Sequence, residues 1–209
     1  VIDAVNDSNI SNIYIVVGHQ AEYIKSITSY PNVTHVLQIE QLGTGHAVMQ
    51  AESAMVLDDN LTLILAGDCP LIKSETIKSL IEFHQEQQAV CTVLTTEMTD
   101  PARYGRIIRN ENGEFTAITE AKDCTDEQLL VKEINSGIFV FNTRLLFEAL
   151  KKITTNNAQN EYYLTDVCHI LRESGERVSA YCIDDSNQVI GINSQEELAE
   201  VSKLILQNN

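Results

Sequence analysis

The sequence predicts an α/β fold: a Rossmann-like, mixed and mostly parallel sheet flanked by helices, with a small inserted hairpin lobe. Short runs rich in Val, Ile and Leu alternate with amphipathic segments along most of the 209 residues. This alternation is typical of βαβ units and a parallel sheet. The pair Asn112-Gly113 stands between two apolar runs, which predicts a hairpin and some antiparallel pairing.

The first half of the chain contains the clearest strand signals. Residues 12–17 form a β-branched run that stops at Gly18, and a continuous apolar run suits a strand covered on both faces. Residues 60–66 form the strongest strand candidate. The expected order is the end of a helix at 1–6, strand 12–17, helix 21–27, strand 33–38, helix 45–55, strand 60–66 and helix 74–88.

The second half continues the alternation after the hairpin. Thr125 with Gln128 and Ser194 with Glu197 have the spacing of capping boxes, which predicts a helix start at each place. The expected order is strand 90–96, apolar runs 104–109 and 115–119, a short helix at 125–128, strand 134–141, helices 144–153 and 162–174, strand 178–183 and a C-terminal helix at 194–208. We expect one domain over 1–209, with the inserted lobe at about 101–132.

Composition and charge narrow the class of partner. The chain has 14 Lys and Arg against 30 Asp and Glu, a formal net charge of −16, and its basic residues form no cluster larger than a pair. Nucleic-acid and anionic-membrane partners are therefore disfavoured, because both need a basic face. No apolar run approaches the ~20 residues of a membrane span. Five cysteines without a Cys-x-x-Cys pair indicate neither a disulfide framework nor a zinc site, so a reducing cytoplasm fits best.

Three polar positions follow predicted strands, at the sheet edge where α/β proteins bind ligands. The glycines around Thr44 allow backbone N–H groups to approach a base or an oxyanion; a plain turn with Thr44 as helix N-cap is an equal alternative. Asp68 has the chemistry of a Mg²⁺ ligand or catalytic group, although it could simply cap the turn before Pro70. Asn193 could offer its side-chain oxygen to the same ion, or could be a turn residue.

Other polar residues interrupt apolar surroundings. Glu120 and Asn135 stand within or beside predicted strands, and a buried polar group is costly unless it is paired. Ligand contacts and internal hydrogen bonds explain them equally well, whereas core packing explains Tyr162 best. No Gly-x-Ser-x-Gly elbow or Walker loop occurs, so hydrolase and P-loop functions lack support.

Several motifs in series resemble one known family. In order they are QIEQLGTGHA at 38–47, LAGDCP at 65–70, YGRI at 104–107, EAKD at 120–123, EINSGI at 133–138, NNAQ at 156–159, EYYLTD at 161–166 and GIN at 191–193. This series is similar to the uridylyltransferase domain of the bacterial bifunctional N-acetylglucosamine-1-phosphate uridylyltransferase/glucosamine-1-phosphate acetyltransferases. The resemblance covers residues 1 to about 200, and the number of motifs makes it highly specific.

The resemblance implies a sugar-nucleotide transferase. The phosphate of N-acetylglucosamine 1-phosphate would attack the α-phosphorus of UTP, and UDP-N-acetylglucosamine and pyrophosphate would leave, to supply cell-wall and lipopolysaccharide synthesis in the cytoplasm. The implied uracil contacts are Gln38, Gly43 and Thr44, and the implied Mg²⁺ ligands are Asp68, which is also the catalytic candidate, and Asn193. The implied sugar contacts and pocket walls are Tyr104, Gly105, Glu120, Asn135, Tyr162 and Thr165.

The chain departs from the family pattern at both ends. The family begins with a strand and a Leu-x-x-Gly-x-Gly-Thr-Arg-Met nucleotide loop, which do not precede Val1; we therefore expect these residues alone to bind UTP poorly. At the other end the family continues into a β-helix domain with acetyltransferase activity, and a homotrimer would form through that domain. The alternatives are a non-catalytic sugar-nucleotide binding module and a related transferase for another sugar 1-phosphate.

Overall fold

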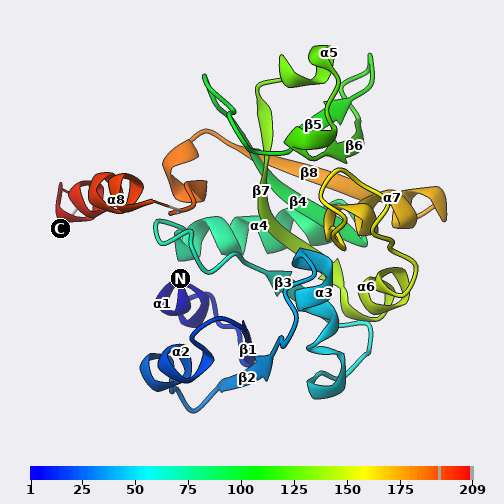
Figure 1. Cartoon of the computed structure of the whole chain (residues 1–209). Helices are drawn as coiled ribbons and strands as arrows, with labels where there is room; N and C mark the ends of the chain where they lie inside the picture. The colour runs from blue at the N-terminus through cyan, green and yellow to red at the C-terminus, as the bar shows by residue number, and fades with distance from the viewer. Residues whose placement is uncertain (193, 208–209) are drawn as a thin grey trace.

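The computed structural model describes residues 1–192 and 194–207 as helices packed around a mixed sheet (Figure 1). The strands are β1 (Ile13–Val17), β2 (Val33–Leu37), β3 (Leu61–Ile64), β4 (Cys91–Glu97), β5 (Arg106–Arg109), β6 (Phe115–Thr119), β7 (Glu133–Asn142) and β8 (Val178–Ile183). The helices are α1 (Ile2–Asn6), α2 (Ala21–Ile27), α3 (Thr44–Met49), α4 (Ser74–Glu86), α5 (Asp126–Leu129), α6 (Thr143–Leu150), α7 (Thr165–Glu173) and α8 (Gln195–Gln207). Short 3₁₀ turns lie at Glu52–Ala54, Ala121–Asp123 and Ser186–Val189.

The main sheet has the strand order β6-β5-β7-β4-β8, with β3 also paired to β7. Strand β7 runs antiparallel to β3, β4 and β5, whereas β4 and β8 are parallel. The predicted mixed sheet flanked by helices is confirmed, but the expected parallel majority is wrong, since most pairings within this sheet are antiparallel. The cause is β7, which at 10 residues is long enough to pair with three other strands.

The alternation of side chains along β7 separates two hydrophobic cores. Phe139 and Phe141 belong to the core that includes residues of α6 and α7, whereas Ile138 and Val140 belong to the core that includes residues of α4. Successive side chains of a strand point to opposite faces of its sheet, so each helix layer covers one face. All four residues are 0–1% exposed, and burial of side chains of this size contributes roughly 1.5–3 kcal/mol each.

Strands β1 and β2 form a separate two-stranded parallel sheet. With α1 and α2 they occupy the blue region of Figure 1, on the far side of β3 from the rest of the main sheet. Among the described residues, β1 pairs only with β2 and β3 pairs only with β7, so each has one edge without a strand partner. The prediction that the run 12–17 is covered on both faces is wrong for most of β1, because Val17 is its only buried residue.

Strand β7 continues through the polar residues that the sequence marks as an interruption. The pairing of β7 with β4 shifts register between Val93 and Thr95, and Gly137 there has a φ of 77°. The Ser136 hydroxyl donates to the Leu94 carbonyl at 2.6 Å, and the Asn135 side-chain oxygen accepts from the Gly137 N–H at 2.9 Å. A bulge therefore carries these polar groups inside the sheet with their hydrogen bonds satisfied.

The hairpin and both capping boxes form as predicted. Strands β5 and β6 pair antiparallel across the Asn112-Gly113 turn. Thr125 with Gln128, and Ser194 with Glu197, exchange the reciprocal bonds of a capping box. Helix α7 begins at Thr165 and not at 162, because the preceding residues dock on another loop. Within the described ranges, no helix combines the length and the apolar character that crossing a bilayer requires.

Candidate active site

The loop before α3 is fixed by close backbone packing. Gly43 has a φ of 114°, and a Cβ at this position would lie 2.7 Å from the Tyr162 carbonyl oxygen. The Tyr162 N–H donates to the Leu42 carbonyl at 2.8 Å, and the Gly45 N–H donates to the Tyr162 carbonyl at 2.8 Å. Glycine is needed at position 43 for both conformation and space.

Thr44 does not cap α3. Gly43 is the N-cap and offers no side chain, so the alternative of Thr44 as an N-cap is wrong. The Thr44 hydroxyl oxygen instead accepts a hydrogen bond from the Leu164 N–H at 3.1 Å. The loop therefore joins α3 to the segment that leads into α7.

Gln38 completes this corner. It is 9% exposed, and its side-chain amide donates to the Gly43 carbonyl at 3.4 Å and lies 3.1 Å from His46 Nδ1. A cavity of about 300 Å³ is lined by Gln38, Gly43 and Thr44, the three residues predicted to contact uracil, together with Gln41, Ala47 and Glu161. The structure thus brings the nucleotide-contact candidates together.

Asp68 stands on the turn that follows β3. Its side chain is exposed, and its carbonyl accepts a hydrogen bond from the Ile192 N–H at 3.0 Å. One carboxylate oxygen accepts a weak bond from the buried Cys69 thiol, at 3.7 Å. Burial together with the Asp68 charge raises the pKa of Cys69 to about 12, so this thiol stays protonated at neutral pH.

A second group of candidates meets where β5, β6, β7 and α7 converge. The Gly105 carbonyl accepts from the Asn135 N–H at 2.8 Å, and the Thr165 hydroxyl donates to the Glu120 carboxylate at 3.1 Å. A Cβ on Gly105 would lie 3.2 Å from the other Glu120 oxygen. The absence of a side chain at Gly105 therefore lets the Glu120 carboxylate lie close against the β5 backbone.

Glu120 is the carboxylate of this group, and its pKa is raised. Burial raises the pKa of its carboxyl, the Thr165 hydrogen bond opposes that shift, and the neighbouring charges of Asp123 and Asp166 reinforce it. A partly desolvated carboxylate that accepts one hydroxyl has further lone pairs for donors. Glu120 is therefore well suited to accept a hydrogen bond from a ligand hydroxyl or amide.

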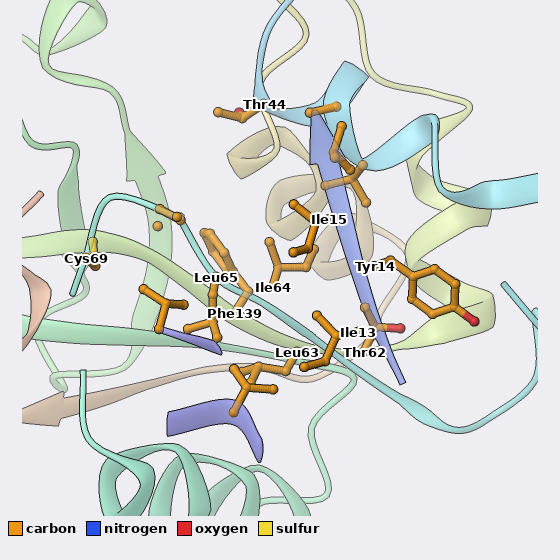
Figure 2. A pocket seen from close by; sticks show the side chains of 18 of the residues that line it. Ile13, Tyr14, Ile15, Thr44, Thr62, Leu63, Ile64, Leu65, Cys69 and Phe139 are labelled. Atoms are coloured by element: carbon orange, nitrogen blue, oxygen red, sulfur yellow. The ribbon is translucent and has the colours of Figure 1, made fainter. Parts of the chain in front are cut away.

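A cavity of about 1750 Å³ joins Asp68 to this group. Its lining includes Thr44, Asp68, Tyr104, Gly105, Glu120, Asn135 and Thr165. Thr44 and Ala47 line both this cavity and the smaller one, so the cavities of the nucleotide and sugar candidates adjoin each other. Figure 2 shows the apolar part of the same cavity, where Ile13 and Ile15 of β1 extend toward Leu63 and Ile64 of β3.

Tyr162 differs from its expected place in the pocket wall. Tyr162 is absent from the lining of either cavity; its ring stacks on His46 with centroids 6.1 Å apart. Asn193 lies outside the described residues. Arg103, which the sequence did not single out, lines the large cavity, and its one signal was its place beside the Tyr-Gly motif.

The donor set at Asp68 fits a hard cation. Its carboxylate is exposed on the turn after β3, and Mg²⁺ in proteins takes one or two carboxylates with water and phosphate oxygens. Within the described ranges, no three His, Cys, Asp or Glu side chains gather closely enough to hold a metal by themselves. Asp68 would therefore hold the ion together with substrate oxygens.

Comparison with known proteins agrees with this arrangement. The sequence profile of the nucleotidyl transferase family matches residues 1–199. The chain belongs to the nucleotidyl transferase family. This nucleotidyl transferase is 48% identical over 202 residues to the bifunctional protein GlmU of Streptococcus mutans, across 97% of the chain and 44% of that relative. It is 43% identical over 207 residues to GlmU of Syntrophomonas wolfei, across 99% of the chain and 46% of that relative.

The nucleotidyl transferase chain thus spans less than half the length of these curated relatives. Its fold is similar to that of a solved UDP-glucose pyrophosphorylase complexed with UDP-glucose, with a TM-score of 0.76 at 17% identity, covering 100% of this chain and 85% of the other. At that identity the likeness concerns the fold.

Proposed function

We propose that this nucleotidyl transferase transfers the uridylyl group of UTP to N-acetylglucosamine 1-phosphate with the help of Mg²⁺. A phosphate oxygen of the sugar phosphate attacks the α-phosphorus of UTP, the bond from that phosphorus to the leaving pyrophosphate breaks, and UDP-N-acetylglucosamine forms. The observation that carries the proposal is the high identity to the GlmU relatives across nearly the whole chain. The two adjoining cavities support it.

Each group of residues has a role in this proposal. Gln38, Gly43 and Thr44 bind the uracil base in the small cavity. Glu120 and Asn135 bind the sugar in the large cavity, which Asp68 also lines. Asp68, together with the proposed ligand Asn193, would hold a Mg²⁺ ion, which would supply charge neutralisation at the phosphorus that is attacked. The described residues would bind and orient the two substrates.

The family pattern also supports proposals about the completion of the site. The family pattern adds a strand and a glycine-rich nucleotide loop, and we propose that these complete the site. The open edges of β1 and β3 beside the large cavity support this.

We also propose a cytoplasmic location and a role in cell-wall precursor synthesis. For the domain organisation, we propose a single nucleotidyltransferase domain over 1–209 with an inserted lobe at about 101–132, and a trimer formed through a further domain.

A pyrophosphate-release assay tests the function. The full-length gene product is mixed with UTP, Mg²⁺ and N-acetylglucosamine 1-phosphate, and we expect one pyrophosphate for each UDP-N-acetylglucosamine. Glucose 1-phosphate in place of the N-acetyl sugar is the matched control, and we expect it to react more slowly. Absence of turnover would refute the function, and faster reaction with glucose 1-phosphate would refute the sugar assignment alone.

A further inference from the structure

Arg103 occupies an unusual place at the entry of the inserted lobe. Among the described residues that line the large cavity, it is the single Lys or Arg. The backbone that carries it is constrained, since Ala102 has a φ of 40°. The Ala102 N–H donates to the Asp100 carboxylate at 3.1 Å, and the Ala102 carbonyl accepts from the Arg106 guanidinium at 3.2 Å. These hydrogen bonds therefore hold the backbone at Arg103 in a fixed conformation.

The Arg103 guanidinium connects the lobe to the other end of the chain. One nitrogen lies 2.9 Å from the Glu197 carboxylate in α8, and the other donates to the Gly191 carbonyl at 3.3 Å. The guanidinium also lies over the Tyr104 ring, 5.8 Å from its centroid. A planar guanidinium can make such contacts at once, whereas the point charge of a lysine cannot.

The Gly191 segment in turn contacts the Asp68 turn. The Gly191 N–H donates to the Tyr104 hydroxyl oxygen at 3.2 Å, and the Ile192 N–H donates to the Asp68 carbonyl at 3.0 Å. A continuous series of contacts therefore runs from Arg103 through Gly191 and Ile192 to the backbone of the proposed metal ligand.

We propose that Arg103 is a positioning residue that fixes Gly191 and Ile192 against the Asp68 turn and so sets where the metal-binding carboxylate stands. The inference rests on the proposed function and extends it to a residue that acts through its contacts with Gly191 and Glu197. The Arg103 side chain is 51% exposed, and an ion pair this exposed adds little to global stability. Its effect is therefore expected at the site and not in the unfolding temperature.

Hydrogen exchange on this chain tests the contact series without any substrate. In Arg103→Ala we expect the amides of Gly191 and Ile192 to exchange roughly fivefold faster, because local opening loses one charge-assisted bond. Arg144→Ala is the matched control, since Arg144 is 46% exposed and its ion pairs, with Asp59 and Glu148, do not involve Gly191, Ile192 or the Asp68 turn. Unchanged exchange at both amides in Arg103→Ala would overturn the inference.

The metal requirement supplies the functional readout in the full-length gene product. We expect Arg103→Ala to raise the Mg²⁺ concentration for half-maximal turnover by roughly fivefold, Arg103→Lys to recover part of that loss, and Arg144→Ala to match the unaltered protein. An unaltered Mg²⁺ requirement in Arg103→Ala would also overturn the inference. Absence of turnover in the unaltered protein would count against the proposed function alone, because the exchange measurement stands without it.

Discussion

At the scale of single residues, Asp68 and Glu120 are carboxylates in opposite surroundings. Asp68 is exposed on a turn, whereas Glu120 is held beside Gly105 and Thr165 and has a raised pKa because of burial. An exposed carboxylate can bind a cation without a large desolvation cost, while a desolvated one favours neutral hydrogen-bond donors. We therefore expect substitutions of Asp68 and of Glu120 to have different effects on activity and stability.

Replacing Asp68 should remove the metal-dependent step. We expect Asp68→Ala to reduce Mg²⁺-dependent turnover of the full-length gene product by about 10²-fold or more, because charge neutralisation at the phosphoryl group is lost. The unfolding temperature should change little, since the side chain is exposed. Pyrophosphate release and thermal unfolding measured together check this. Full activity in the variant would remove Asp68 from the site.

Because of Glu120, the free energy of unfolding should depend on pH, and the sign of that dependence follows from the direction of the pKa shift. Its pKa is raised in the folded state, so between the ordinary carboxyl pKa of about 4.3 and the raised value the folded state binds more protons than the unfolded state. The free energy of unfolding therefore falls as pH rises through that window and is level above it.

Glu120→Gln should flatten this fall, because an amide keeps an acceptor for Thr165 and does not titrate. Urea unfolding at several pH values from 4 to about 8 compares the variant with the unaltered chain. Glu111→Gln, at an exposed position of the hairpin turn, is the control that should leave the slope as it was. Equal slopes for all three proteins would contradict the assigned burial effect.

Local sequence was sufficient to predict some of the site residues but not others. Gln38, Gly43 and Thr44 lie within seven consecutive positions, so a loop motif could group them, and Asp68 was recognisable from the strand before it. The contacts of Arg103 could not be predicted from its place beside the Tyr-Gly motif, because its partners Gly191 and Glu197 come from the other end of the chain. Tyr162 contacts the glycine loop through its backbone N–H and carbonyl groups. A pattern of side chains in the sequence does not predict such backbone contacts.

At the scale of elements, the glycine loop and the 162–164 segment form one unit. Their backbones exchange hydrogen bonds on both sides of Gly43, and a Cβ there would lie 2.7 Å from one backbone atom and 2.9 Å from another. Neither atom can move without breaking the docking of the segment that starts α7. The shape of the small cavity thus depends on contact between distant parts of the sequence.

Gly43→Ala should therefore be costly. We expect it to lower the free energy of unfolding by at least about 3 kcal/mol, from backbone strain and the close approach combined. Gly113→Ala is the matched control: Gly113 has a φ of 79° but nothing within 4 Å of the added carbon, so only about 1 kcal/mol is expected. Urea denaturation measures both. Equal losses would show that conformation alone, and not the contact with Tyr162, makes position 43 sensitive.

The elements themselves were predicted better than their assembly. Helix α2 and strand β8 have the predicted bounds, because their periodicity and end signals are local. The direction of pairing was not predictable in the same way: β7 joins three strands from separate parts of the chain, and its polar bulge residues suggested an interruption. Register and neighbour are set by packing of both faces, which periodicity does not encode.

At the scale of the whole molecule, two strand edges face one cavity. All residues of β1 and β3 line it. Since neighbouring side chains of a strand point to opposite faces, a cavity that reaches all of them runs along the backbone edges. Both strands are apolar, yet Leu61 remains 38% exposed. Unpaired, apolar edges of this kind pair readily with another strand.

A strand added between β1 and β3 should consequently stabilise the molecule more than a strand of the same length that pairs along one edge. We expect an N-terminal extension with the family's first strand to raise the unfolding temperature by roughly 5–15 °C, because it would hydrogen-bond to β1 and β3 at once and cover their side chains. The same extension with a proline at the centre of the strand is the control, since proline removes a ladder bond and is excluded from central strands. Differential scanning calorimetry distinguishes them: equal unfolding temperatures would mean that the cavity between β1 and β3 does not take a strand.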